Sequence, residues 1–364
     1  MRNGDELHIA ALPGDGIGVE VMNACLAVLD ALARRSGLIS LRVERLAAGA
    51  GHFRDTGCAL PDETVEAAKK ADAILFGAMG LPDVRTEDGT EIQPQLDLRV
   101  MLDLYAGVRP IRAMPGGPTP LADPRARGID LVIVREQTEG LFSDVGRARV
   151  ENDTAVDRMV ITRRGAERVT DFAFALAKDR KRDGRRGHVT CVDKANVLAS
   201  TAFFRKIFLE RAARHQDIES ACMYVDAASL NLVRAPWEFD VLVTENMFGD
   251  ILSDLCAGLV GGMGLAPSGD IGDEYCLFQP CHGSAPDIAG RDLANPTAML
   301  LSAVLMLDWL AKRRGLDPLR DAAALLDGAI CEGYAAGHIR PAEFGGPDGT
   351  RAVANKVIEL IRNA

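Results

Sequence analysis

The feature that most constrains the fold is the alternation of short apolar runs with segments of helical spacing in the N-terminal part of the chain. The runs typical of strands cover residues 7–12, 41–46 and 73–76. The segments typical of helices cover residues 19–33 and 61–70. Strands that alternate with helices at this spacing form a sheet with crossover helices. The sequence therefore predicts an α/β fold.

Composition places the chain among ordinary globular proteins. Its 364 residues are enough for about two domains. With 48% hydrophobic and 26% charged residues, it has neither a disordered nor a fibrous bias. The net charge of −10 opposes non-specific binding to a phosphate backbone, so we expect no nucleic-acid partner.

No membrane segment and no export signal are expected. The longest apolar run, residues 298–307, is interrupted by Ser302 and is shorter than the roughly 18 residues that span a bilayer. The first residues carry no basic segment followed by an apolar stretch, so we expect no leader and a cytoplasmic location. The eight cysteines form no C-x-x-C pair, which favours reduced thiols.

Three polar or glycine-rich segments have a predicted place in the fold. A proline–glycine coil at 114–124 precedes an apolar strand at 131–134, and a domain crossing is expected near 105–109. The polar residues 147–162 are expected to form a projecting hairpin that meets a partner subunit. The basic stretch 178–186 carries two aspartates and follows a helical segment, which favours a solvated helix end over a nucleic-acid site.

Two carboxylates indicate a metal site. Asp250 and Asp254 stand four residues apart in a segment of helical spacing, so they share one face of a helix. Like charges at this spacing repel each other unless a cation lies between them, and Mg²⁺ and Mn²⁺ prefer carboxylate oxygens. Two solvated acids on an exposed helix are the alternative for the isolated pair.

Three arginines indicate an anionic substrate. Arg135 directly follows the apolar strand at 131–134, where α/β sheets present ligand groups. Arg109 precedes a proline and is expected to be extended, and Arg99 lies shortly before it. Because guanidinium groups bind carboxylates through paired hydrogen bonds, converging arginines imply a substrate with several carboxylates. Each arginine taken alone is better explained as a surface charge.

Small residues dominate a loop before the helix that begins near Pro296. The loop reads His282-Gly283-Ser284-Ala285-Pro286-Asp287-Ile288-Ala289-Gly290 and is followed by Asn295. Small residues let a backbone approach phosphates closely, and Asp287 suits two ribose hydroxyls while it repels a 2′-phosphate. The loop predicts a dinucleotide site that prefers NAD, and a purely structural loop is the alternative.

The N-terminal glycines are a weaker signal. Gly14, Gly16 and Gly18 are spaced G-x-G-x-G, which differs by one residue from the dinucleotide fingerprint. A tight turn between strand and helix explains them equally well.

Taken together, these segments resemble the metal-dependent β-decarboxylating dehydrogenases, the family of isopropylmalate, isocitrate, homoisocitrate, tartrate and D-malate dehydrogenases. The likeness runs from residue 12 to residue 350. Its most specific motifs are DKANV at 193–197, NMFGDILSD at 246–254 and HGSAPDIAG at 282–290. The resemblance implies NAD-dependent oxidative decarboxylation of a 3-substituted (R)-malate-type 2-hydroxy diacid, with 3-isopropylmalate as the first candidate.

The resemblance also implies an architecture. It is a two-domain fold of the isopropylmalate dehydrogenase type, with a mixed sheet that is not a true Rossmann fold. The large domain comprises residues 1–104 and 260–364 and carries the NAD-binding loop. The smaller domain comprises residues 105–259, with the dimer interface, the arm at about 147–162 and the metal-binding helix. Two such chains are expected to form a homodimer with shared active sites.

Individual roles follow from the same resemblance, position by position. The residues that bind the substrate are Arg99, Arg109, Arg135, Gln95, Leu96 and Val197. The ligands of Mg²⁺ or Mn²⁺ are Asp250 and Asp254 of one subunit and Asp226 of the partner subunit, and the catalytic residues are Asp226 and the base Lys194, both from the partner. The NAD site consists of His282, Gly283, Ser284, Ala285, Pro286, Asp287, Ile288 and Asn295.

Two positions depart from the family pattern. Phe142 stands where the family usually has a tyrosine that donates or relays a proton, and a phenyl ring cannot donate one. Gln95 stands where isopropylmalate dehydrogenases usually have a leucine, and Gln93 adds to the polarity. The alternatives are therefore a tartrate- or D-malate-type dehydrogenase with a more polar pocket, or a catalytically weakened relative.

Two other classes of function also have to be weighed. A non-catalytic sensor or interaction protein is motivated by Phe142, but the retention of Lys194 and of three aspartates argues against it. A metal-dependent hydrolase would use the aspartates alone and leaves the loop at Asp287 unexplained.

Overall fold

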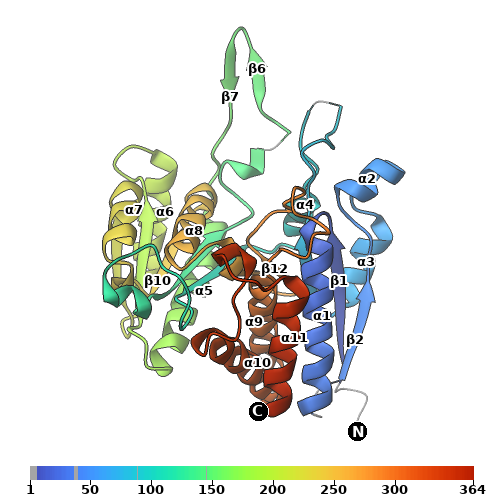
Figure 1. Cartoon of the computed structure of the whole chain (residues 1–364). Helices are drawn as coiled ribbons and strands as arrows, with labels where there is room; N and C mark the ends of the chain where they lie inside the picture. Colours follow the sequence, from blue (N-terminus) through green and yellow to red (C-terminus); the bar gives the residue numbers. More distant parts are fainter. Residues whose placement is uncertain (1–5, 37–39, 88, 145) are drawn as a thin grey trace.

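The computed structural model describes residues 6–36, 40–87, 89–144 and 146–364. The expected absence of a leader concerns residues 1–5, which lie outside the described residues. A ten-stranded sheet is the framework of the described part of the chain (Figure 1). Its strands follow one another in space in the order β2 (Ser40–Arg45), β1 (Glu6–Gly14), β3 (Ala73–Ala78), β12 (Cys276–Pro280), β11 (Pro267–Ile271), β4 (Ala106–Arg112), β5 (Asp130–Glu136), β10 (Val241–Thr244), β8 (His188–Asp193) and β9 (Glu219–Tyr224).

The sheet is mixed, as predicted. β2, β1, β3 and β12 are parallel at one end, and β5, β10, β8 and β9 are parallel at the other. Between these blocks, β11 is antiparallel to β12 and β4, and β4 is antiparallel to β5. The sheet is therefore continuous across both halves of the chain, and the division into domains at residues 105 and 260 stays a proposal.

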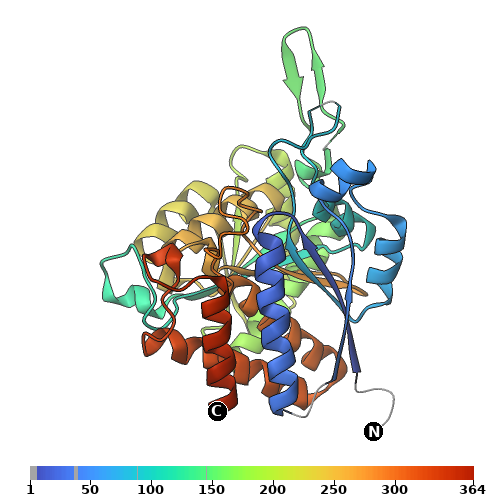
Figure 2. The same cartoon turned by 45° about the vertical axis from the view of Figure 1, so that its right-hand side comes forward.

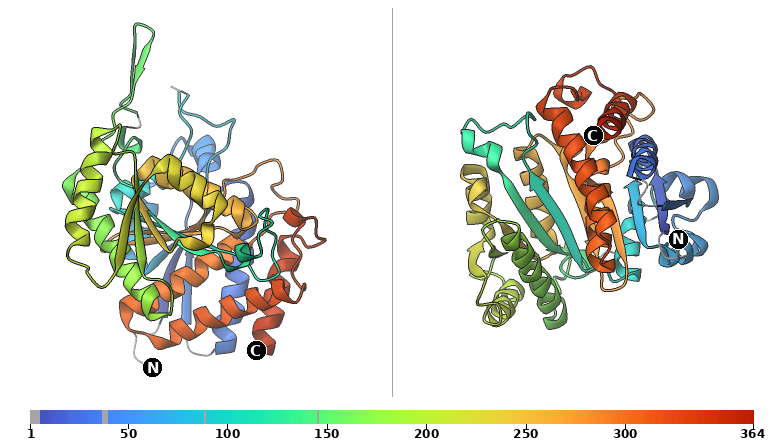
Figure 3. Two further views of the ribbon diagram at one scale, coloured as in Figure 1. Left: turned by 90° about the vertical axis from the view of Figure 1, so that its left-hand side faces the viewer. Right: turned by 90° about the horizontal axis from the view of Figure 1, so that it is seen from below.

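Helices cover both faces of the sheet (Figure 3). They are α1 (Ile17–Ser36), α2 (Ala50–Thr56), α3 (Asp62–Lys70), α4 (Pro94–Met101), α5 (Arg163–Arg182), α6 (Ala199–Ala212), α7 (Val225–Arg234), α8 (Asn246–Leu259), α9 (Thr297–Arg314), α10 (Asp317–Ala335) and α11 (Thr350–Asn363). None of the helices within the described ranges combines the length and the apolar character that crossing a membrane requires.

The strands are buried on both faces of the sheet, which explains why their sequences are continuous apolar runs. In β5, Val132 and Val134 pack into the core that contains α5, whereas Leu131 and Ile133 pack into the core that contains α8. Because successive side chains of a strand point to opposite faces, both residue sets must be apolar when helices cover both faces. The predicted strands at 7–12, 41–46, 73–76 and 131–134 coincide with β1, β2, β3 and β5.

The hairpin expected in residues 147–162 is present. Strands β6 (Arg149–Glu151) and β7 (Thr154–Val156) pair antiparallel, and they project away from the body of the molecule (Figure 2). Asn152 and Asp153 connect them with φ values of 49° and 57°, which suit a tight two-residue turn. All six strand residues are exposed.

The N-terminal glycines form a tight turn. A Cβ atom at Gly14 would lie 2.1 Å from the backbone oxygen of Ala78, and one at Gly16 would lie 2.0 Å from that of Ser284. Both glycines also have positive φ, which disfavours any side chain. The space beside the turn is thus filled by the protein's own backbone, so close packing accounts for the G-x-G-x-G spacing.

Packing of α8 on β5 requires a glycine, and this generates a prediction. A Cβ atom at Gly249 would lie 2.7 Å from Cβ of Arg135. We expect Gly249→Ala to lower the free energy of unfolding by about 1–3 kcal/mol, because the helix must move away from the strand. Equilibrium unfolding in urea measures this change.

The control is Gly328→Ala in α10, where a Cβ atom would have no neighbour within 4 Å. This exposed helical position should gain about 0.5–1 kcal/mol from alanine. Equal effects of the two substitutions would contradict the packing argument.

Candidate active site

A cleft of about 450 Å³ opens beside the carboxyl ends of β3, β12 and β5. Ligand sites of α/β sheets commonly lie at this edge of the strands. Helices α4 and α8 complete the walls. The residues that line the cleft are Phe76, Gly77, Ala78, Met79, Gln93, Gln95, Leu96, Arg99, Arg109, Arg135, Phe142, Asp250, Asp254, Gln279, Pro280, Cys281, His282 and Gly283.

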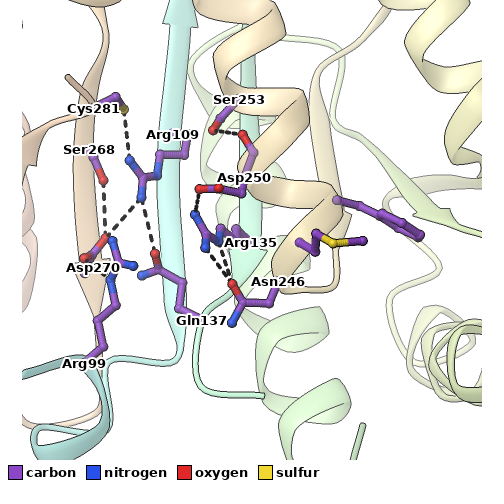
Figure 4. A network of polar contacts seen from close by, with 12 residues as sticks. Arg99, Arg109, Arg135, Gln137, Asn246, Asp250, Ser253, Ser268, Asp270 and Cys281 are labelled. Carbon is purple, nitrogen blue, oxygen red and sulfur yellow. Dashed lines mark hydrogen bonds and ion pairs between the residues drawn. The ribbon is translucent and has the colours of Figure 1, made fainter. Parts of the chain in front are cut away.

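The three predicted arginines converge in this cleft although they come from different elements. Arg99 lies on α4, Arg109 in the middle of β4 and Arg135 near the end of β5, and all three are buried. Figure 4 shows Arg109 and Arg99 on one side of the cluster and Arg135 on the other. Buried guanidinium groups require compensating acceptors, since an unpaired buried charge is strongly destabilising.

Arg135 is held by α8. Its Nε and Nη2 atoms donate to Oδ1 of Asn246 at 2.9 and 2.7 Å, and Nη1 donates to Asp250. Burial, together with the positive charge of Arg99, lowers the pKa of Arg135 to about 10, which still leaves the group charged at neutral pH. The ring of Phe142 lies 5.2 Å from the guanidinium carbon, so Phe142 covers this arginine within the cleft.

Helix α8 is fixed at its start by Glu245. The side chain of Glu245 accepts hydrogen bonds from the backbone N–H groups of Met247 and Phe248 at 3.1 and 2.7 Å. This cap satisfies donors that a helix N-terminus otherwise leaves open. It thereby sets the position of Asn246 and Asp250 beside Arg135.

Arg99 and Arg109 are held by a residue that the sequence did not single out. Asp270 on β11 is fully buried, and its Oδ2 accepts from Nε of Arg99 at 2.9 Å. Its Oδ1 lies 3.9 Å from Nη2 of Arg109. Burial raises the pKa of Asp270, but the two arginine charges outweigh burial and keep that pKa below its ordinary value. Arg109 also donates to Cys281 and Gln137 at 3.0 and 3.3 Å.

Asp250 and Asp254 both line the cleft, one turn apart on α8. Burial and the neighbouring Asp250 raise the pKa of Asp254, so a cation between the two carboxylates would relieve an unfavourable arrangement. The pair therefore fits two positions in the shell of a hard divalent cation. Among the described residues of this one chain, no third carboxylate lies close enough to complete such a site.

Lys194 and Asp226 form a separate cluster. Lys194 directly follows β8, and its Nζ lies 2.6 Å from Oδ1 of Asp226 in the first turn of α7. The hydrogen bond and charge of Lys194 lower the pKa of Asp226. Val197 lies on the same segment as Lys194 and is 67% exposed. None of these three residues lines the cleft within its own chain, whereas Gln95 and Leu96 do.

The predicted cofactor loop joins the cleft at one end. His282 and Gly283 line the cleft, and the Nε2 atom of His282 is buried without a partner within the described residues. Asp287 is exposed and is available to a ligand. Ser284 is buried, donates to the backbone oxygen of Gly80 and accepts from the N–H of Ile17 through its own backbone oxygen at 2.8 Å.

The side chain of Asn295 is engaged inside the protein. Its Oδ1 accepts from Oγ1 of Thr297 at 2.7 Å, and its Nδ2 donates to Glu343 at 2.9 Å. Asn295 is buried. Its side chain therefore supports the start of α9, and its role in cofactor binding stays a prediction.

One further group of metal-ligand residues lies elsewhere. Cys191, Asp193 and Cys222 have ligand atoms within 4.8 Å of one another. Both carboxylate oxygens of Asp193 already accept from Arg205, at 2.7 and 2.8 Å. The positive charge of Arg205 opposes a cation at this place.

The link between Asn246 and Arg135 yields a prediction. Asn246→Leu keeps the number of heavy side-chain atoms and the branching but removes the acceptor shared by Nε and Nη2 of Arg135. We expect a loss of about 1–3 kcal/mol in the free energy of unfolding, because buried donors of a charged group are left unpaired. Equilibrium unfolding in urea measures the loss.

Asn246→Asp is the matched variant, since it keeps an acceptor oxygen for Arg135 and loses only the hydrogen bond from Nδ2 to the backbone oxygen of Glu139. It should cost less than the leucine variant. The opposite ranking would contradict the prediction and would show that the negative charge added by Asn246→Asp costs more than unpaired donors of Arg135.

Comparison with known proteins places this geometry in a family. The chain matches the profile described as isocitrate/isopropylmalate dehydrogenase over residues 8–357. It is 44% identical over 357 residues to the 3-isopropylmalate/3-methylmalate dehydrogenase of Methanocaldococcus jannaschii, covering 97% of this chain and 98% of that protein. It is 40% identical to the homoisocitrate dehydrogenase of the same organism, with 98% of each chain covered.

A solved structure agrees with these relatives. The crystal structure of isocitrate dehydrogenase from Methylococcus capsulatus superposes with a TM-score of 0.85 at 35% identity, covering 98% of this chain and 99% of that one. The α/β fold, the mixed sheet and the motifs quoted from the sequence therefore have one common explanation. The chain belongs to the isocitrate/isopropylmalate dehydrogenase family, and it is an oxidoreductase that acts on a CH–OH group and decarboxylates its substrate.

Proposed function

We propose that the chain is an NAD-dependent dehydrogenase that uses Mg²⁺ or Mn²⁺ and oxidatively decarboxylates a 3-substituted (R)-malate. The observation that carries this proposal is the convergence of three buried arginines and two aspartates in one cleft. 3-Isopropylmalate is the first substrate to test, because it appears in the name of a relative with 44% identity. The cytoplasmic location stays a prediction from the sequence.

A homodimer is part of the proposal, because one chain holds the active-site residues in two separate clusters. Helices α7 and α8 pack against each other and expose large apolar side chains. Leu230 and Val233 on α7 are 56% and 43% exposed, and Ile251 on α8 is 58% exposed. Burial of such a face against a second copy is favourable. Since Asp226 lies on α7 and Asp254 on α8, that contact would bring Lys194 and Asp226 of the partner subunit to this cleft.

The residues present fit the proposed cofactors. Asp250 and Asp254, joined by Asp226 of the partner subunit, would hold the divalent cation with carboxylate oxygens. The exposed Asp287 would bind the ribose hydroxyls of NAD, and Gly283, where a Cβ atom would meet no atom within 4 Å, leaves room for close approach. When bound, the cation supplies Lewis acidity at the oxygens of the acid, and NAD accepts the hydride.

The chain's own groups account for binding and proton transfer. Arg99, Arg109 and Arg135 bind the two carboxylates through charge-assisted hydrogen bonds. Nζ of Lys194 of the partner subunit takes the proton of the C2 hydroxyl, which becomes a carbonyl as the C2 hydride leaves. The bond from C3 to its carboxylate then breaks with release of CO₂, and C3 must receive a proton. Phe142 lines the cleft but has no proton to give, so the proton comes from water or from another side chain.

The proposal is tested by NADH formation in the presence of Mn²⁺ and a panel of 2-hydroxy acids that includes 3-isopropylmalate, malate, tartrate and isocitrate. We expect turnover on at least one diacid and loss of about 10²-fold or more in kcat for Lys194→Ala, which removes the base. Tight ligand binding without turnover would favour a sensor. Turnover that requires Phe142→Tyr would identify a weakened relative.

Mixing two inactive variants tests the shared site. Lys194→Ala and Asp254→Asn alter different clusters, so each mixed dimer contains one intact site. If subunits exchange at random, half of the dimers are mixed, and about a quarter of the wild-type activity should return. A site built within a single chain would give no recovery, and each variant dimer alone is the control.

The surroundings of Gln95 support a second candidate substrate, a tartrate-type acid. Its Oε1 atom is buried at the cleft and has no hydrogen-bond partner within the described residues. A buried acceptor without a donor is unfavourable, and a hydroxyl on C3 of the substrate would supply that donor. This observation supports a tartrate-type acid over an acid with an isopropyl group.

Gln95→Leu separates the two substrates. We expect kcat/KM to rise on 3-isopropylmalate and to fall on tartrate, each by about 10- to 100-fold, because an apolar wall accepts the isopropyl group and leaves the hydroxyl unpaired. Leu96→Met, a volume-conserving change in the same cleft, is the control and should shift both values together. A rise in kcat/KM on both acids would contradict a role of Gln95 in recognising the C3 substituent.

A further inference from the structure

Asp270 places a negative charge directly behind the arginine cluster. It lies on β11, next to β4, and its side chain is fully buried. Oδ2 accepts from Nε of Arg99 and from Nε2 of Gln279, both at 2.9 Å. Oδ1 accepts from Oγ of Ser268 at 3.3 Å and lies 3.9 Å from Nη2 of Arg109. Figure 4 shows the carboxylate between Arg99 and Arg109.

This position changes the charge that the cleft offers to an anion. The described residues lining the cleft include three guanidinium groups and the carboxylates of Asp250 and Asp254, and the proposed divalent cation would offset those two carboxylates. Burial lowers the pKa of His282, which favours its neutral form. Asp270 compensates one of the three positive charges without facing the cleft. The remaining two charges match an acid with two carboxylates. In a buried site, each uncompensated unit charge strongly changes the free energy of anion binding.

The wall formed by α4 offers no cation to a further carboxylate. Gln93 and Gln95 line the cleft there, and both end in neutral amides. Arg99, one turn beyond Gln95, has its charge offset by Asp270 and serves the two carboxylates of the diacid. A third carboxylate there would meet neutral amide N–H donors but no compensating cation, which is costly for a buried charge.

We propose that Asp270 is a specificity-determining residue that restricts the cleft to acids with two carboxylates and discriminates against acids with three. The inference rests on the proposed function and narrows it. It distinguishes two kinds of substrate that appear in the names of the relatives, since isopropylmalate carries two carboxylates and homoisocitrate carries three.

The test compares two anions of nearly the same shape. Tricarballylate carries three carboxylates, and its terminal monoamide carries two. Their dissociation constants are measured by isothermal titration calorimetry on the whole chain with saturating Mg²⁺, at a pH where both acids are fully ionised. The wild-type protein should bind the monoamide more tightly. Asp270→Asn, which is isosteric and removes one negative charge, should shift the ratio of the two constants toward tricarballylate by about tenfold or more.

Gln279 provides a matched set of controls, because its amide is bonded to Asp270. Gln279→Glu adds a negative charge and should shift the ratio toward the monoamide. The double variant Asp270→Asn with Gln279→Glu moves the carboxylate to the neighbouring side chain and restores the total charge. Its ratio should return to the wild-type value, which a purely structural role of Asp270 does not predict. The double variant and Gln279→Glu keep the test valid if Asp270→Asn alone does not fold.

Two results would overturn the inference. The first is an unchanged ratio in Asp270→Asn and in Gln279→Glu while both variants keep the wild-type circular dichroism spectrum. The second is a double variant that behaves like Asp270→Asn. Either result leaves the proposed function intact. A wild-type protein that binds neither acid but forms NADH with a 2-hydroxy diacid would also overturn the inference alone. In contrast, absence of both binding and NADH formation would contradict the proposed function.

Discussion

The burial of three guanidinium groups in one cleft is the constraint on which the rest of the site depends. Each group is expensive to remove from water, and each therefore has an acceptor that is itself fixed by secondary structure. Asn246 and Asp250 reach Arg135 from a capped helix, and Asp270 reaches Arg99 from an antiparallel strand. The strand order brings these acceptors together, because β4 and β11 lie side by side between the two parallel blocks.

Much of the fold could be predicted because long apolar patterns reflect burial. The strands β1, β2, β3 and β5 and the first helix were all evident from their spacing. Strand β11 was not, because its sequence Pro-Ser-Gly-Asp-Ile contains only one large apolar residue and has no periodic signal. Asp270 was missed for the same reason. The available clue was an acid placed between Gly269 and Ile271 in a segment otherwise free of charge.

The candidate site was predictable residue by residue but not as an assembly. Motif and spacing singled out the arginines and Asp250, and the structure brings them into one cleft. The same reasoning did not reveal that the side chain of Asn295 is hydrogen-bonded inside the protein, to Thr297 and Glu343. Spacing alone also did not reveal that Lys194 and Asp226 form a cluster apart from the cleft. Lys194 is bonded to Asp226 within its own chain, away from the cleft.

The contacts of the first strand–helix unit have a consequence for biosynthesis. Strand β3 pairs with β12, α1 packs against α11 near the other end of the chain, and the turn at Gly16 rests on Ser284. Residues that lie far apart in the sequence are thus packed together. Such non-local contacts cannot form until the ribosome has released the segment that carries β12 and α11, and apolar surface on β1 and α1 stays uncovered meanwhile. Aggregation through this uncovered surface competes with folding during synthesis.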